Sequence, residues 1–167
     1  EIAHDVNTVV LDKTGTVTEG KPRVTDVLCG DSSGKELLSV AASLESRSSH
    51  PLAEPILQEA YREGADIREV QEYRMIPGQG IAGKLDGQDC YAGNRRLMQT
   101  LGISAENFLS EEERLADEGK TPLYFALGNR LLGLIAAADV VKPTSREAVA
   151  RMQEMGMDVI MLTGDNA

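Results

Sequence analysis

The stretch NTVVLDKTGT, residues 7–16, joins an apolar run directly to an aspartate and a group of small polar residues. Residues 8–11 have the composition of a short buried strand, so Asp12 would stand where that strand ends. A second apolar run, residues 159–162, also ends on small polar residues, in the sequence TGDN. Two such strands favour neighbouring places in one parallel sheet, and open α/β sheets bind ligands at the carboxyl edge.

The composition excludes several classes of protein. The chain has 167 residues, of which 41% are hydrophobic and 26% charged, so it is long enough to bury a core. A net charge of −10 argues against a nucleic-acid or anionic-lipid partner. The longest apolar run, residues 131–138, is far shorter than the ~20 residues of a membrane helix, and we expect no signal peptide. Cys29 and Cys90 lack the spacing of a disulfide framework or zinc site, which indicates free thiols in a reducing cytosol.

The segment between the two apolar runs reads as an inserted domain of helices and antiparallel strands. The patterns predict helices over residues 35–44, 95–101 and 105–118, and strands over 23–28, 69–75, 123–127 and 131–138. A further helix should begin with Pro51 in its first turn, and Pro55 should cause a kink or an irregular start. Asp86-Gly87 and Gly128-Asn129 are typical of hairpin turns. We therefore expect an antiparallel sheet with helices packed on it, an α+β arrangement.

The last segment begins after Lys142-Pro143, just as the inserted segment begins near Lys21-Pro22. Thr144 and Glu147 have the spacing of a capping box, and the helix should end at Gly156. Its predicted buried stripe consists of Ala148, Val149, Met152 and Met155. The sequence thus predicts an α/β fold in which residues 1–21 and 139–167 form one parallel α/β domain, with residues 22–138 inserted between the two Lys-Pro hinges. Residues 12–20 are expected to form a polar loop.

The residues DKTGT suit phosphoryl transfer. Asp12 at a strand end can act as a covalent nucleophile that accepts a phosphoryl group. Lys13 adds positive charge, and the backbone at Gly15 and the hydroxyls of Thr14 and Thr16 offer hydrogen-bond donors for phosphoryl oxygens. Thr163 can supply another hydroxyl from the end of the second strand. An isolated Asp-Lys-Thr-Gly is more often a turn, but its pairing with TGDN at a second strand end favours the catalytic interpretation.

DKTGTVTEG together with MLTGDNA resembles the P-type ion-transporting ATPases, whose phosphorylation domain has a haloacid dehalogenase-like fold. The resemblance implies that ATP phosphorylates Asp12 and that Mg²⁺ binds at Asp12 and Thr14. A related small-molecule phosphatase typically has a second aspartate, the acid/base for hydrolysis, at the position of Thr14. Without that acid a phosphoaspartate should live longer, which suits a transport cycle. The implied catalytic set is Asp12, Lys13, Thr14, Thr163, Gly164 and Asp165.

The inserted segment resembles the nucleotide-binding domain of heavy-metal-transporting P-type ATPases. HPLAEPI, IPGQGIAG and GNRRLM look more like the copper-type domains than the zinc or cadmium ones. The resemblance gives Glu45 and His50 roles at the adenine end of ATP, and it places Asp139 and Lys142 at an acidic-to-basic hinge signature. The implied nucleotide-binding residues are Glu45, His50, Gly78, Gly80, Ile81, Gly93 and Asn94.

Taken singly, these residues have simpler interpretations. His50 before a helix is more often a solvated or packing residue, Glu45 can be a surface residue at a helix end, and Gly93-Asn94 can be a turn. GQGIAG, residues 78–83, formally fits the dinucleotide fingerprint, but a hairpin signal follows it instead of a helix, so NAD binding is rejected. Only the ordered set favours the nucleotide interpretation.

The resemblance predicts an ATP-binding cytoplasmic fragment of a heavy-metal, copper-type ATPase at a bacterial plasma membrane. Its partners would be ATP, the remaining phosphorylation, actuator and transmembrane domains of the same polypeptide, and a transported metal ion bound elsewhere, with no nucleic acid. The chain ends at Ala167, before the family's GDGxNDxP segment that holds Mg²⁺, so we expect ATP binding without turnover. One alternative is a soluble haloacid dehalogenase-like phosphatase or phosphotransferase with a cap, and another is a binding module without catalysis.

Overall fold

A computed structural model describes residues 7–162, and the chain divides into two compact units. The larger unit consists of residues 23–138, and the smaller unit contains the chain before residue 23 and after residue 138. The transitions between the units fall within the long strands β2 (Thr18–Cys29) and β7 (Arg130–Val141). The functional assignment of each unit stays a prediction.

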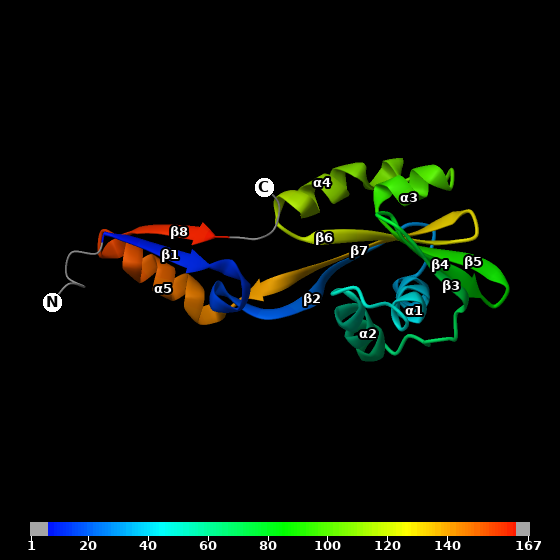
Figure 1. The fold of residues 1–167 in the computed structure, drawn as a ribbon, viewed down its shortest axis with the longest axis horizontal. Helices are drawn as coiled ribbons and strands as arrows, with labels where there is room; N and C mark the ends of the chain where they lie inside the picture. Colours follow the sequence, from blue (N-terminus) through cyan, green and yellow to red (C-terminus); the bar gives the residue numbers. More distant parts are fainter. Residues whose placement is uncertain (1–6, 163–167) are drawn as a thin grey trace. The chain divides into compact units, whose positions relative to one another are not determined.

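The larger unit is built on a six-stranded sheet in the order β2-β7-β6-β5-β4-β3 (Figure 1). The pairs from β3 through β7 are all antiparallel, which confirms the expected sheet. Asp86 and Gly87, between β4 and β5, have φ angles of 51° and 81°, the paired positive values of a tight hairpin turn. The remaining strands are β3 (Gln71–Ile76), β4 (Gly80–Leu85), β5 (Gln88–Gly93) and β6 (Thr121–Leu127).

Helices cover both faces of this sheet (Figure 1). In β6, Phe125 packs in the core beneath α1 (Gly34–Glu45) and α2 (Ala53–Arg62). The adjacent residue Tyr124 packs in a second core on the other face of the sheet. Successive strand residues point to opposite faces, so a strand buried on both sides reads as a continuous apolar run. The second face carries α3 (Arg95–Thr100), η3 (Glu106–Phe108) and α4 (Leu109–Asp117).

The start of α2 differs from the prediction at Pro51. The helix begins at Ala53, so Pro51 lies in the turn before it, and Pro55 is the third helical residue. The first N–H groups of a helix have no intrahelical partner, so a proline there loses no hydrogen bond. Pro55 therefore lies where a helix tolerates proline, and the placement of Pro51 in the first helical turn is wrong.

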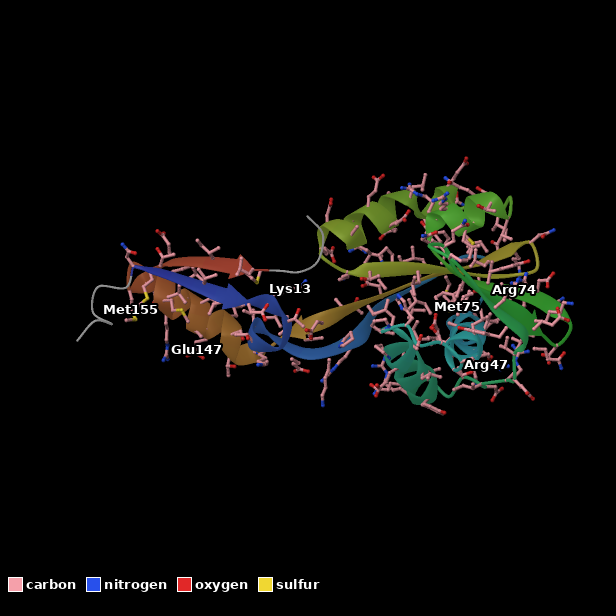
Figure 2. All side chains as sticks on the ribbon, in the orientation of Figure 1. Lys13, Arg47, Arg74, Met75, Glu147 and Met155 are labelled. Atoms are coloured by element: carbon pink, nitrogen blue, oxygen red, sulfur yellow. The ribbon has the colours of Figure 1, made fainter. Side chains whose placement is uncertain are left out.

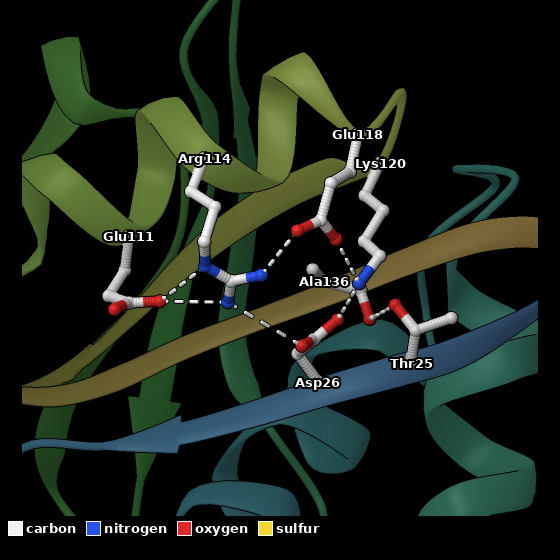
Figure 3. A network of polar contacts seen from close by, with 7 residues as sticks. All are labelled: Thr25, Asp26, Glu111, Arg114, Glu118, Lys120 and Ala136. Carbon is white, nitrogen blue, oxygen red and sulfur yellow. Dashed lines mark hydrogen bonds and ion pairs between the residues drawn. The ribbon is translucent and has the colours of Figure 1, made fainter.

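A charged network fastens α4 to β2 (Figure 3). The Lys120 ammonium lies 2.8 Å from the Asp26 carboxylate and 2.7 Å from that of Glu118. Arg114 adds contacts to Glu111 and Glu118 at 2.8 and 2.6 Å. Burial raises the pKa of Asp26, but hydrogen bonds with Lys120 and Thr25 and the nearby positive charges outweigh it, so the pKa is lowered.

The smaller unit pairs β1 (Thr8–Asp12) with β8 (Asp158–Leu162) in parallel, as predicted. Asp12 is in register with Leu162, so both strands end at the same edge. The polar loop is shorter than expected, because only the π-type turn η2 (Lys13–Val17) separates β1 from β2. Val17 and Thr18 are buried, which favours extended structure directly after the turn.

The last helix, α5 (Pro143–Glu154), corrects two predictions. Lys142 is the N-cap and Pro143 the first helical residue, so Thr144 lies inside the helix and the predicted capping box with Glu147 is wrong. Of the predicted buried stripe, Val149 and Met152 are half-buried, but Ala148 and Met155 are exposed. The described part of this unit offers the helix a two-stranded sheet to pack on, which is too narrow to cover the whole stripe.

The sequence predicts no membrane-spanning helix and two free cysteines, and the structure of residues 7–162 bears on both. None of the helices there has the length and hydropathy to cross a bilayer. Cys29 is exposed and Cys90 is buried, and both are free thiols, as the spacing predicted.

Candidate functional site

The larger unit contains a cavity of ≈ 480 Å³ between the end of α1, the turn from β3 to β4, and the start of α3. Tyr73, Met75 and Leu123 give its wall an apolar part. A volume of this size suits a small-molecule ligand. Every residue predicted to bind nucleotide lines this one cavity: Glu45, His50, Gly78, Gly80, Ile81, Gly93 and Asn94.

Glu45 places a buried carboxylate in the cavity wall. It is the last residue of α1 and only 3% of its surface is exposed, and its Oε2 has no hydrogen-bond partner among residues 7–162. Burial raises the pKa of Glu45, and a hydrogen bond with Ser48 opposes that shift only in part. The negative end of a helix is also an unfavourable place for a carboxylate. An acceptor kept in such surroundings points to a ligand that brings a donor.

His50 offers the opposite kind of group at the same cavity. Its ring Nδ1 accepts a hydrogen bond from the backbone N–H of Leu52 at 3.3 Å, and the backbone N–H of His50 donates to the Ser48 hydroxyl at 3.0 Å. Desolvation lowers the pKa of His50, which favours the neutral ring at pH 7. Because Nδ1 is the acceptor, the ring hydrogen of that neutral form lies on Nε2. The cavity therefore combines a buried acceptor with a ring N–H donor.

Two glycines let the backbones of β4 and β5 approach closely beside the cavity. Gly80 and Gly93 are register partners. A Cβ added to Gly80 would lie 2.1 Å from the Ala92 carbonyl oxygen, and one added to Gly93 would lie 2.2 Å from the Gln79 oxygen. Both positions thus require glycine, and the GQGIAG segment runs from a hairpin turn into β4, which agrees with the rejection of a dinucleotide fingerprint.

Asn94 joins the other two elements of the cavity. As the N-cap of α3 its Oδ1 accepts from the Leu97 N–H at 3.1 Å, and its Nδ2 donates to the Gly78 carbonyl at 3.0 Å. Gly78 has a φ of 69° and open space around its missing Cβ. A single side chain therefore fixes the glycine turn against the helix start.

Sequence reasoning missed the apolar wall of the cavity. Tyr73 and Met75 are two positions apart in β3, so the period of two of a strand places both on one face. The sequence contained this signal. The Arg47 guanidinium lies 5.7 Å from the centre of the Tyr73 ring, and its Nη1 donates to the Val70 carbonyl at 3.0 Å. Met75, labelled in Figure 2, is 70% exposed and lines the cavity. An exposed thioether beside a cavity is suited to covering a flat apolar ligand.

The predicted phosphoryl acceptor lies in the smaller unit. Asp12 is exposed at the end of β1, followed by Lys13 and Thr14 in η2. Thr163, Gly164 and Asp165 lie outside the described residues. Across residues 7–162, His, Cys, Asp and Glu side chains form no group of three that could hold a metal ion. The Mg²⁺ site at Asp12 and Thr14 therefore stays a prediction.

The family model "Hydrolase: haloacid dehalogenase-like hydrolase" matches residues 6–167. The chain belongs to the haloacid dehalogenase-like hydrolase family. Among its relatives, the copper-exporting P-type ATPase of Bacillus subtilis (strain 168) is 42% identical over 99% of this chain. The copper-exporting P-type ATPase B of Archaeoglobus fulgidus is 41% identical, also over 99%. This hydrolase-family chain spans only 21% and 24% of those two relatives.

Solved structures of ATPases have the same fold as this haloacid dehalogenase-like chain. A zinc-transporting PIB-type ATPase in an E2.Pi state superposes with a TM-score of 0.83 at 31% identity, covering 96% of this chain and 26% of the other. A CPx-ATPase catalytic domain, CopB-B, described for its conformational changes upon nucleotide binding, has a TM-score of 0.68 at 26% identity. That match covers 98% of this chain and 54% of the other.

Proposed function

We propose that this chain is the ATP-binding and phosphoryl-accepting part of a heavy-metal-transporting P-type ATPase of the copper type. ATP bound in the cavity of the larger unit phosphorylates Asp12, and the phosphorylated state drives transport of the ion by other domains of the same polypeptide. The relatives named as copper-exporting P-type ATPases support this proposal, since they match almost the whole chain while being several times longer.

The observation that carries the proposal is the Oε2 of Glu45 in the cavity wall, which finds no hydrogen-bond partner in the described part of the chain. The exocyclic amino group of adenine is a donor on a flat aromatic ring, so it satisfies this acceptor while the ring covers the apolar wall. The His50 Nε2–H is suited to an acceptor on the same ligand. Guanine has a carbonyl where adenine has its amino group, and it would meet the Glu45 oxygen acceptor to acceptor.

Phosphoryl transfer follows from the position of Asp12. One carboxylate oxygen forms a bond to the γ-phosphorus of ATP, the bond from that phosphorus to the β–γ bridging oxygen breaks, and ADP leaves. Lys13 places a positive charge next to the acceptor in the sequence. The exposed Asp12 carboxylate and the Thr14 hydroxyl are hard oxygen donors of the kind that Mg²⁺ prefers, and bound Mg²⁺ would neutralise phosphate charge. With threonine at position 14, the acid for rapid hydrolysis seen in related phosphatases is missing, so the phosphoaspartate should persist.

The remaining assignments follow from the relatives. The chain would lie on the cytoplasmic side of the membrane, where ATP is available, with the actuator, transmembrane and remaining phosphorylation domains as partners and the transported ion bound elsewhere. Copper is favoured because relatives named for copper transport reach 42% identity, whereas the zinc-transporting structure is 31% identical.

Calorimetric titration of the chain with ATP and GTP tests this function. ATP should bind, and GTP should bind at least about tenfold more weakly because of the mismatch at Glu45. Equal affinity for the two nucleotides, or no affinity for ATP, would contradict the proposal.

A further inference from the structure

The turn that follows Asp12 is held together by the hydroxyl of Thr18. Thr18 is 2% exposed, and its Oγ1 accepts from the Gly15 N–H at 3.1 Å and lies 2.9 Å from the Lys13 carbonyl oxygen. Gly15 has a φ of 76°, with open space where a Cβ would be. The turn is therefore closed at its base by one buried hydroxyl, while residues 14–16 are exposed.

Asp139, far away in the sequence, holds the chain directly after this turn. Its carboxylate accepts from the Gly20 N–H at 3.2 Å and the Lys21 N–H at 3.1 Å, and it also forms a short contact with the Thr18 hydroxyl. A carboxylate that accepts from several donors fixes their directions more firmly than neutral hydrogen bonds do. Because the same Thr18 hydroxyl closes the turn, Asp139 is coupled to the turn itself.

Lys142 binds the backbone carbonyl groups of the turn. Its ammonium donates to the carbonyl oxygens of Gly15 at 2.8 Å and Thr16 at 3.1 Å, and its backbone N–H donates to the Val17 carbonyl at 3.0 Å. In a trans peptide the C=O and the following N–H point in opposite directions. Holding the Gly15 carbonyl therefore turns the Thr16 N–H to the side away from Lys142.

We infer that Asp139 and Lys142 are positioning residues for phosphorylation of Asp12, acting as a clamp that fixes the turn through Thr18 and the Gly15 and Thr16 carbonyls. This inference rests on the proposed function of Asp12. The side chain of Asp139 bonds to Thr18, Gly20 and Lys21, and that of Lys142 bonds to Gly15 and Thr16, so the clamp acts on the acceptor turn and the strand leaving it. A group-transfer reaction is sensitive to small displacements of the attacking atom, so a loosened turn should slow the transfer while leaving nucleotide binding in the other unit intact.

The clamp is tested in the full-length protein with the variants Asp139→Asn and Lys142→Met. The rate at which labelled ATP phosphorylates the protein should fall ~10- to 100-fold, while the ATP concentration for half-maximal rate changes less than about twofold. Thr18→Val should behave in the same way, and Thr18→Ser, which keeps the hydroxyl, should restore most of the rate. Glu147→Gln, an exposed position on α5 (Figure 2), is the matched control and should match the parent.

Amide hydrogen exchange of the same proteins separates the clamp from the proposed function. Exchange over residues 13–21 should be faster by about tenfold in Asp139→Asn and Lys142→Met and unchanged over residues 78–94. If exchange accelerates in this way but the parent is never phosphorylated at Asp12, the clamp stands and the proposed function fails. If Asp12 is phosphorylated and the variants match the parent in rate and exchange, or if Thr18→Ser is as slow as Thr18→Val, the clamp is wrong.

Discussion

Replacing Glu45 with methionine should stabilise the larger unit and weaken nucleotide binding at the same time. Methionine has a similar length and fills the same space without the unpartnered oxygen. An unsatisfied buried acceptor destabilises the fold by roughly 1–3 kcal/mol. Losing the interaction with Ser48 that partly lowers the Glu45 pKa offsets some of the gain from removing that acceptor. We expect a net gain of about 1 kcal/mol in the free energy of unfolding, or roughly 3–6 °C in the melting temperature.

The opposite change is expected in the affinity for ATP. A hydrogen bond between a ligand and a charged group contributes about 1.5–3 kcal/mol, so its loss should weaken binding ~10- to 150-fold. Calorimetric unfolding and titration with ATP, both at pH 7, measure the two effects. If Glu45 only supported the fold, its replacement would lower both the stability and the affinity for ATP. If it is a binding acceptor, its replacement raises the stability and lowers the affinity.

The pH dependence gives an independent check on Glu45. Because its pKa is raised in the folded state, the folded protein holds the proton of this carboxyl more tightly than the unfolded chain does, and that contribution to stability is lost as pH rises through the folded pKa. The stability advantage of Glu45→Met should therefore grow as the pH rises from about 4.5, the ordinary pKa of a glutamate, through the raised folded pKa. The control is Glu113→Met at an exposed position on α4, which should change neither property. A lower melting temperature for Glu45→Met, or unchanged ATP affinity, would refute this account of the carboxylate.

Three further predictions concern the glycines, the charged network and the two units. Gly80→Ala should lose more than about 3 kcal/mol of stability because its Cβ meets a backbone oxygen, whereas Gly78→Ala should lose only ~1–2 kcal/mol from its positive φ; urea unfolding distinguishes them. Lys120→Met should cost roughly 1 kcal/mol at pH 7, and its deficit should shrink in acid as Asp26, whose folded pKa is lowered, becomes protonated. His50→Ala should weaken ATP binding about tenfold while Asp12→Asn leaves it unchanged, and equal losses in titration would oppose the assignment.

Local patterns predicted most of the fold. The parallel pairing of β1 with β8 follows from two apolar runs that both end on small polar residues, and the Asp86-Gly87 turn follows from the positive φ values that these residues tolerate. The errors occurred where distant parts of the chain decide the outcome. Met155 fits a helical apolar stripe, yet it is 71% exposed because the described sheet beneath α5 is narrow.

The candidate site could be predicted in part. Glu45 and Asn94 were selected by resemblance, and the structure brings them to one cavity, but their physical roles depend on details that the sequence does not show. The missing partner of the Glu45 oxygen results from the packing of α1, and the bond from Asn94 to the Gly78 carbonyl spans 16 positions. Thr18 gave no signal beyond its place in the motif, because its role requires Asp139, 121 positions away.

The most direct test of the central claim is to identify the phosphorylated residue in the full-length protein after incubation with its ion and ATP labelled in the γ-phosphate. We predict an acid-stable, hydroxylamine-sensitive label on Asp12 that is absent from Asp12→Asn. Label that persists in Asp12→Asn, or a parent protein that hydrolyses ATP without ever carrying label at this position, would contradict the account.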